Sequence, residues 1–296
     1  MNPILNLHEV AKDTGFFAAD DGTQIYFETH GAGEPIVLVY GICCLINHWH
    51  HQIAHFAKTY KVIAFDIRGH HLSETPTDKT KLTIRNIADD VRALLDHLKI
   101  PQAHLFGHSF GAPILITFGG KYPERVRSLS FINGFAQNPI KGMFGLDVIE
   151  PLYHFIEKQY WLAPKMWDQI WKLAINNPLA MFLSGVAGGF NLRLTQFEDI
   201  EIYTRGVSQM ALPVVLPLFA DMMSFNGTDI LKKMHLPTLI IAGEKDAVTP
   251  MHFQEEMHNL IADSKFVCVP YGSHCTQLDY PDYVNLSLER HIQTHR

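Results

Sequence analysis

The stretch Gly107-His108-Ser109-Phe110-Gly111 decides the fold because of what lies on either side of it. It directly follows a short apolar run, His104–Gly107, that predicts a strand, and it directly precedes a helical pattern over Ala112–Lys121. A G-x-S-x-G motif between a strand and a helix is the context of a nucleophile elbow. The serine of such a turn has unfavourable backbone angles, so small residues are needed on both sides. The position of the motif, more than its letters, predicts Ser109 as a nucleophile.

Around this motif the chain alternates short apolar runs with helical patterns. Such alternation predicts βα units and a mostly parallel sheet. A helix is expected over Leu82–Leu98, where apolar residues recur at helical spacing. The expected strands are Gln24–His30, Ile36–Tyr40, Lys61–Asp66, His104–Gly107, Val126–Ile132, Thr238–Ala242 and Lys265–Val269.

From about Phe135 the pattern becomes helical and stays so for nearly a hundred residues. Apolar side chains from Ile149 to Tyr160, and again from Trp167 to Ala174, follow the spacing of amphipathic helices. Further along lies an apolar run broken by prolines, 211–220. We therefore predict a helical insertion over residues 136–230, with residues 1–135 and 231–296 forming the core domain.

A serine nucleophile needs a histidine base and a carboxylate that orients it, in the chain order Ser, Asp or Glu, His. Asp246 lies in the loop beyond Thr238–Ala242, and His274 lies in the loop beyond Lys265–Val269. Active sites in open α/β sheets form where parallel strands end, so these loops should meet near Ser109. Glu244 competes with Asp246 but is closer to the strand end.

A tetrahedral intermediate also needs two N–H donors for its negatively charged oxygen. We assign the backbone N–H of Phe110, directly after the nucleophile, and that of Ile42 in the loop after Ile36–Tyr40. Any residue type can donate a backbone N–H, so only the positions are inferred.

The sequence resembles the α/β-hydrolase superfamily over nearly its whole length outside the insertion. The resemblance rests on Asp66-Ile67-Arg68-Gly69-His70, Gly107-His108-Ser109-Phe110-Gly111, Tyr122-Pro123-Glu124-Arg125-Val126 and Gly243-Glu244-Lys245-Asp246. It implies a mostly parallel eight-stranded sheet with helices on both faces and an inserted helical cap.

The chain departs from the family pattern at two positions. Tyr40 stands where the oxyanion loop usually begins with His, and His71 stands where Gly usually follows the Arg68-Gly69-His70 loop. Both departures should alter the floor of the site. Some relatives carry the acid after the preceding sheet strand, but that position here is Asn133, which has no charge. Dehalogenases and epoxide hydrolases of the family carry Asp in the elbow, whereas this chain carries Ser109.

The composition of the chain limits the kinds of molecule that the protein is expected to bind. The chain has 296 residues, of which 47% are hydrophobic. Its formal net charge of −6 argues against nucleic acid as a binding partner, because a phosphate backbone is bound by clustered Lys and Arg. No apolar stretch reaches the roughly 18 residues of a membrane span, and the start lacks the features of a secretory signal. The four cysteines are too few for a disulfide framework, so we expect buried free thiols and, by default, a cytoplasmic protein.

Three histidines, His48, His51 and His55, recur on one helical face, as metal ligands sometimes do. No carboxylate or cysteine accompanies them locally, so no metal and no cofactor are expected. The tryptophans of the insertion are expected to pack the insertion itself or to form an apolar ceiling over the substrate.

These observations favour an esterase that cleaves a small, apolar carboxylic ester through an acyl-enzyme. The same residues would serve hydrolysis of a carbon–carbon, lactone, thioester or amide bond. A ligand-binding protein without catalysis is the remaining alternative. The sequence leaves the oligomeric state open.

Overall fold

The computed structural model describes residues 12–141, 143–145, 148–175, 179 and 189–295. Its eight strands form one sheet in the order β1-β2-β4-β3-β5-β6-β7-β8. The strands are β1 (Lys12–Ala18), β2 (Gln24–His30), β3 (Glu34–Val39), β4 (Tyr60–Phe65), β5 (Ala103–His108), β6 (Val126–Ile132), β7 (Thr238–Gly243) and β8 (Lys265–Val269). The pairs β1/β2 and β2/β4 are antiparallel and every other neighbouring pair is parallel, so the mostly parallel eight-stranded sheet is confirmed.

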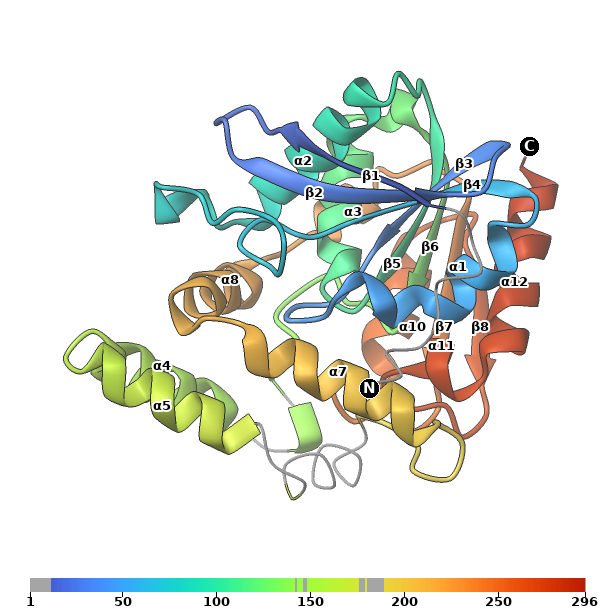
Figure 1. Cartoon of the computed structure of the whole chain (residues 1–296). Helices are drawn as coiled ribbons and strands as arrows, with labels where there is room; N and C mark the ends of the chain where they lie inside the picture. The colour runs from blue at the N-terminus through green and yellow to red at the C-terminus, as the bar shows by residue number, and fades with distance from the viewer. Residues whose placement is uncertain (1–11, 142, 146–147, 176–178, 180–188, 296) are drawn as a thin grey trace.

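Helices cover both faces of this sheet (Figure 1). Those of the core are α1 (His50–Phe56), α2 (Ile84–His97), α3 (Gly111–Lys121), α10 (His252–Leu260), α11 (Thr276–Asp279) and α12 (Pro281–Thr294), with the 3₁₀ turns η2 (Ile46–Trp49), η3 (Lys79–Lys81) and η4 (Pro123–Arg125). The central strands are buried on both faces, as in β3, where Ile36, Val37 and Leu38 are fully excluded from solvent.

Strand β1 was not among the strands expected from the residue pattern. Its sequence, KDTGFFA, has no regular alternation, because it lies at the edge of the sheet and pairs only with β2. Phe17 is buried while Phe16 is half exposed, so only one of the two aromatic side chains of the strand packs into the core.

A run of helices is inserted between β6 and β7. These are α4 (Ile149–Tyr160), α5 (Pro164–Ile175), α7 (Phe197–Gln209), α8 (Leu212–Ser224) and α9 (Thr228–Leu231), with the turn η5 (Met143–Gly145). The expected boundary at residue 230 falls inside α9. The prolines of the apolar run do not break it: α8 is one continuous helix, with Pro213 in its first turn and Pro217 inside.

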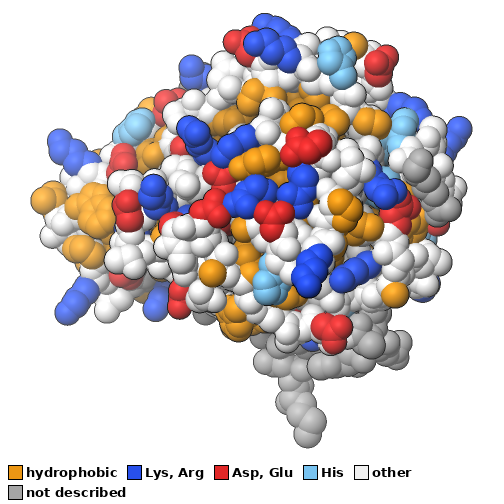
Figure 2. All heavy atoms as spheres, turned by 90° about the horizontal axis from the view of Figure 1, so that it is seen from above, with side chains coloured by type: hydrophobic (Ala, Val, Ile, Leu, Met, Phe, Trp, Pro, Cys, Tyr) orange, Lys and Arg blue, Asp and Glu red, His pale blue; other side chains and the backbone are white. Residues whose placement is uncertain are grey.

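Surface charge is mixed in sign. Figure 2 shows a face on which Lys and Arg side chains interleave with Asp and Glu. Ion pairs of this kind include Arg92 with Asp20 and Asp96, at 2.5 and 2.7 Å. Among the described residues no single helix is long and apolar enough to cross a membrane; α7 and α8 reach that composition only together, across a bend of 101°.

Candidate active site

Ser109 lies in the turn between β5 and α3, with a backbone φ of 52° that few residues other than glycine adopt. The turn is tight enough to require both flanking glycines. A Cβ on Gly111 would lie 2.2 Å from the Val39 carbonyl oxygen, and one on Gly107 would lie 2.9 Å from the Gly111 carbonyl carbon. A hydrogen bond from the Ser109 N–H to the Ile132 carbonyl oxygen, at 3.0 Å, stabilises this strained turn.

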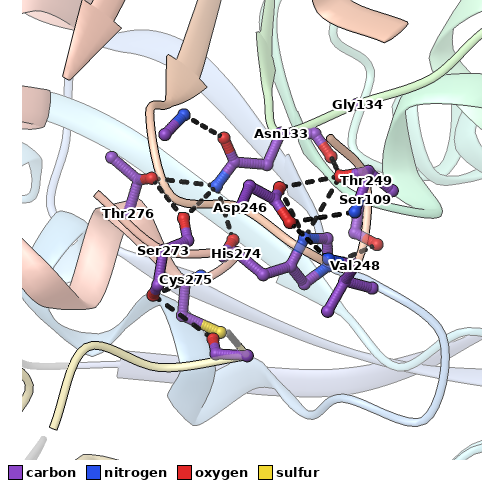
Figure 3. A network of polar contacts seen from close by, with 12 residues as sticks. Ser109, Asn133, Gly134, Asp246, Val248, Thr249, Ser273, His274, Cys275 and Thr276 are labelled. Carbon is purple, nitrogen blue, oxygen red and sulfur yellow. Dashed lines mark hydrogen bonds and ion pairs between the residues drawn. The ribbon is translucent and has the colours of Figure 1, made fainter. Parts of the chain in front are cut away.

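The structure brings the three side chains expected from sequence into one chain of hydrogen bonds (Figure 3). Ser109 Oγ is 3.0 Å from His274 Nε2, and His274 Nδ1 is 2.9 Å from Asp246 Oδ2. Ionised Asp246 can only accept, so His274 Nδ1 carries the proton and Nε2 presents its lone pair to the serine hydroxyl. That tautomer is the one a general base requires.

Asp246 is fixed by its own loop. The N–H groups of Val248 and Thr249 donate to its Oδ1 at 2.8 and 2.9 Å, and the Thr249 hydroxyl lies 2.8 Å from Oδ2. The competing carboxylate, Glu244, is exposed and accepts the N–H of Tyr271 at 2.9 Å, away from His274. The geometry therefore favours Asp246 over Glu244.

Asn133 is a functional-site residue that sequence reasoning considered only as a missing acid. Its Nδ2 lies 2.8 Å from the Ser273 carbonyl oxygen and 2.6 Å from that of His274, while its Oδ1 accepts the Gly243 N–H at 2.7 Å. The side chain is fully buried and joins the ends of β6, β7 and β8 (Figure 3). A carboxylate here would face two carbonyl oxygens, which explains why this position carries an amide.

His108, inside the elbow, supports the same loop. Its Nε2 donates to the His274 carbonyl oxygen at 2.9 Å. Burial and the nearby His274 and His48 hold the pKa of His108 well below its usual range, so it stays a neutral donor. No feature of the sequence other than its place in the motif pointed to this role.

The loop carrying Ile42 is held by two histidines from the 66–71 loop. The Cys43 N–H donates to His70 Nε2 at 3.1 Å, and His71 Nε2 donates to the Cys44 carbonyl at 2.8 Å. Burial lowers the pKa of His70 to about 3, which keeps Nε2 an acceptor. Within the described chain, the N–H groups of Ile42 and Phe110 donate to no protein oxygen.

The two departures from the family pattern have visible consequences. The Tyr40 hydroxyl donates to Asp66 Oδ1 at 3.1 Å and accepts the Ile67 N–H at 2.8 Å, so it ties the Ile42 loop to the end of β4. His71 takes a positive φ of 42°, in a position where glycine would be unstrained, and uses its ring to hold Cys44.

The environments of the cysteines do not support a reaction at a thiol. Cys43, Cys44 and Cys275 are buried and free as expected, whereas Cys268 is exposed, so the expectation of burial was wrong for Cys268. Burial raises the pKa of the Cys43 thiol to about 12, which leaves it protonated and unreactive.

An apolar cavity of about 310 Å³, open to solvent on one side, lies between the inserted helices. Neither Ser109 nor His274 lines this cavity. Its walls come from α4, α5 and α8 and are lined by Ile149, Leu152, Tyr153, Ile156, Trp167, Ile170, Trp171, Ala174, Leu212, Val215, Leu216 and Phe219.

A strained serine after the parallel strand β5, with a carboxylate after β7 and a histidine after β8, is the arrangement of the α/β hydrolases. A family model described as the alpha/beta hydrolase fold matches residues 34–281. The chain therefore belongs to the α/β-hydrolase fold family.

Known proteins resemble the chain over most of its length. It is 26% identical over 271 residues to the "Putative carbamate hydrolase RutD" of Azorhizobium caulinodans, covering 91% of this chain and 95% of that protein. It is 22% identical to bifunctional epoxide hydrolase 2 of Rattus norvegicus, covering 95% of this chain but 55% of that longer protein. A solved thermophilic esterase from Thermogutta terrifontis superposes with a TM-score of 0.74 at 20% identity, covering 96% of this chain and 100% of that one, which shows a shared fold.

Proposed function

We propose that this α/β hydrolase is a serine esterase in which Ser109 is the nucleophile, His274 the base and Asp246 the carboxylate that orients it. The observation that carries the proposal is the unbroken chain of hydrogen bonds from Ser109 Oγ through His274 to Asp246. A protein that only binds ligands has no need for all three groups in this order.

In the proposed reaction, Ser109 Oγ attacks the ester carbonyl and its proton passes to His274 Nε2. The oxygen of the tetrahedral intermediate accepts the N–H groups of Ile42 and Phe110. The C–O bond to the alcohol breaks as His274 returns the proton to the leaving oxygen. Water, deprotonated by His274, then attacks the acyl-enzyme and frees the acid and Ser109.

We further propose that residues 136–230 form a cap over this site. Helix α7 is close to the oxyanion loop, since a Cβ added to Gly206 would lie 2.2 Å from the Leu45 side chain. Just before α7, the Gly189 carbonyl accepts the Cys275 N–H at 3.2 Å, directly after the proposed base. These contacts support an insertion that covers Ser109 and excludes water from it.

An apolar substrate fits this insertion better than a charged one. The cavity of about 310 Å³ is lined almost entirely by aliphatic and aromatic side chains. Helix α8, which forms one wall, contacts the 66–71 loop, where Val214 would lie 2.7 Å from a Cβ on Gly69. An acyl or alkyl group buried against such walls gains about 0.8 kcal/mol per methylene.

A carbamate is the second candidate substrate, and the observation that favours it is the similarity to the protein from Azorhizobium caulinodans named above. Carbamate, lactone, thioester, amide and carbon–carbon substrates would all use the same nucleophile and donors. Epoxide hydrolysis is disfavoured because the elbow carries Ser109.

The test is a panel of p-nitrophenyl esters with matched thioester, lactone, carbamate and amide analogues, assayed with wild type and Ser109→Ala. We expect ester turnover by wild type and loss of at least about a thousandfold in the variant. Ser130→Ala is the matched control, because Ser130 is a buried serine of β6 outside the proposed machinery. Turnover of the carbamate alone would replace the ester assignment, and no turnover of any analogue would contradict a hydrolytic function.

A further inference from the structure

Two histidines at the start of α1 and one carboxylate of α7 meet across the boundary between the core and the insertion. His50 Nε2 lies 3.2 Å from Asp199 Oδ1, and His51 Nε2 lies 3.2 Å from Asp199 Oδ2. Asp199 comes from 148 residues further along the chain than His51. The sequence pattern had pointed instead to His48, His51 and His55, of which His55 contacts Glu289.

The contact between His50 and Asp199 is not an ordinary hydrogen bond. His50 Nδ1 lies 2.8 Å from the Asn47 carbonyl oxygen, and a carbonyl only accepts, so Nδ1 carries the proton of the neutral ring. His50 Nε2 then presents a lone pair to a carboxylate oxygen that also has only lone pairs. Both atoms, His50 Nε2 and Asp199 Oδ1, are buried without a hydrogen-bond partner in the described structure.

The Asp199 carboxylate needs a positive charge beside it. Its side chain is 1% exposed, and within the described residues no Lys or Arg lies at ion-pair distance from it. A buried carboxylate without a cation costs several kcal/mol. A proton on His50 or a metal ion between the three groups would each remove the cost.

We propose that His50, His51 and Asp199 bind a divalent transition-metal ion of the Zn²⁺ type, which fastens α7 to the core. Two imidazole nitrogens and a carboxylate are ligands that Zn²⁺ takes at about 2.0–2.1 Å, which sets neighbouring ligand atoms about 3.3 Å apart in a tetrahedron. The two observed separations of 3.2 Å, each from one histidine nitrogen to a different Asp199 oxygen, are close to that value, and the ligand atoms of all three residues lie within 4.8 Å of one another.

Two further features fit a metal site. Metal-binding histidines almost always donate their second ring N–H to a carbonyl or carboxylate, as His50 does to Asn47. The His51 side chain is 24% exposed, so an ion can reach this ligand from solvent. The inference does not depend on the proposed esterase function.

The experiment titrates metal-free protein with Co²⁺ and follows the visible absorption of the bound ion, then displaces it with Zn²⁺. Wild type should bind one ion per chain, and Zn²⁺ should raise its Tm. Asp199→Asn should weaken binding by about a hundredfold or more and abolish the Tm shift. His51→Gln, at a partly exposed position, should do the same and serves if Asp199→Asn fails to fold.

His55→Gln is the matched control, because it removes a histidine–carboxylate contact from the same helix without touching Asp199. It should bind Co²⁺ as wild type does, and so should Ser109→Ala, which separates this test from that of the esterase. Wild type without stoichiometric binding, or Asp199→Asn and His51→Gln with unchanged binding, would overturn the proposal. Binding lost only in His48→Gln would also overturn it and place the ion at the buried cluster of Cys44, His48 and His108.

Discussion

The loops that carry Ser109, Asp246 and His274 are joined by polar contacts, whereas the inserted helices α4, α5 and α8 contact one another mainly through apolar side chains. The buried side chain of Asn133, at the end of β6, hydrogen-bonds to the end of β7 and to the loop after β8. In α4 and α5, by contrast, even large side chains such as Leu152, Phe155 and Leu173 are more than half exposed. We propose that the first region fixes the geometry of the reaction and that the second contacts the apolar part of the substrate.

This comparison predicts a large loss of activity when a polar group beside His274 is changed. Asp246→Asn removes the charge that favours imidazolium and the acceptor that sets the His274 tautomer. We expect kcat to fall by about 10⁴-fold with the fold intact. Glu244→Gln is the control and should leave kcat unchanged, because Glu244 points away from His274. The opposite ranking of the two variants would reassign the acid.

A second prediction concerns Asn133. Asn133→Ala leaves the loops of Gly243 and His274 without their shared partner, so kcat/KM should fall by about a hundredfold as His274 loses its position. Asn133→Asp should be at least as damaging, because its carboxylate would face the carbonyl oxygens of Ser273 and His274. Kinetics on short esters and thermal melts of both variants check this. A wild-type kcat/KM in Asn133→Ala would show that Asn133 is not needed to position His274.

The third prediction separates buried core histidines from exposed ones in the insertion. Burial lowers the pKa of His291 to about 4, so the folded protein holds this ring neutral while the unfolded chain protonates it below about 6.5. The unfolded state then binds more protons, and stability is lost as the pH falls from about 6.5 towards 4.

At pH 5 this single group should cost about 2 kcal/mol of unfolding free energy relative to pH 7. Urea melts of His291→Phe should show a correspondingly shallower acid limb. His154→Gln is the control variant, because the His154 side chain lies at an exposed position of the insertion. An unchanged slope in His291→Phe would show that the ring is not neutral in the folded protein.

The smallest expected effect belongs to the insertion. If the apolar part of the substrate lies against α8 and its neighbours, kcat/KM should rise up to about fourfold per methylene from acetyl to butyryl to hexanoyl esters. Small charged esters should be poor substrates. Equal kcat/KM across the three acyl lengths would mean that the aromatic residues of the insertion only hold the insertion together.

The sequence predicted correctly which residues lie together where their placement follows from chain order and strand position. Ser109, Asp246 and His274 each lie in a loop after one of the parallel strands β5, β7 and β8, and parallel strands end at one edge, so their meeting was predictable. Contacts between distant segments were not predictable in this way. Nothing near His50 indicates that Asp199 would lie beside it, and Asn133 was considered only for the charge it lacks. Strand β1 was missed because polar and apolar residues do not alternate in its sequence, KDTGFFA.

The central claim, that Ser109 is the nucleophile, is tested most directly by labelling with a fluorophosphonate followed by intact-mass analysis and peptide mapping. The account predicts one adduct per chain, located on Ser109, and none on Ser109→Ala. Because the reagent requires a serine activated by its base, Asp246→Asn should label far more slowly than wild type. An adduct on any other residue, or an unlabelled wild-type protein that is folded, would contradict the account.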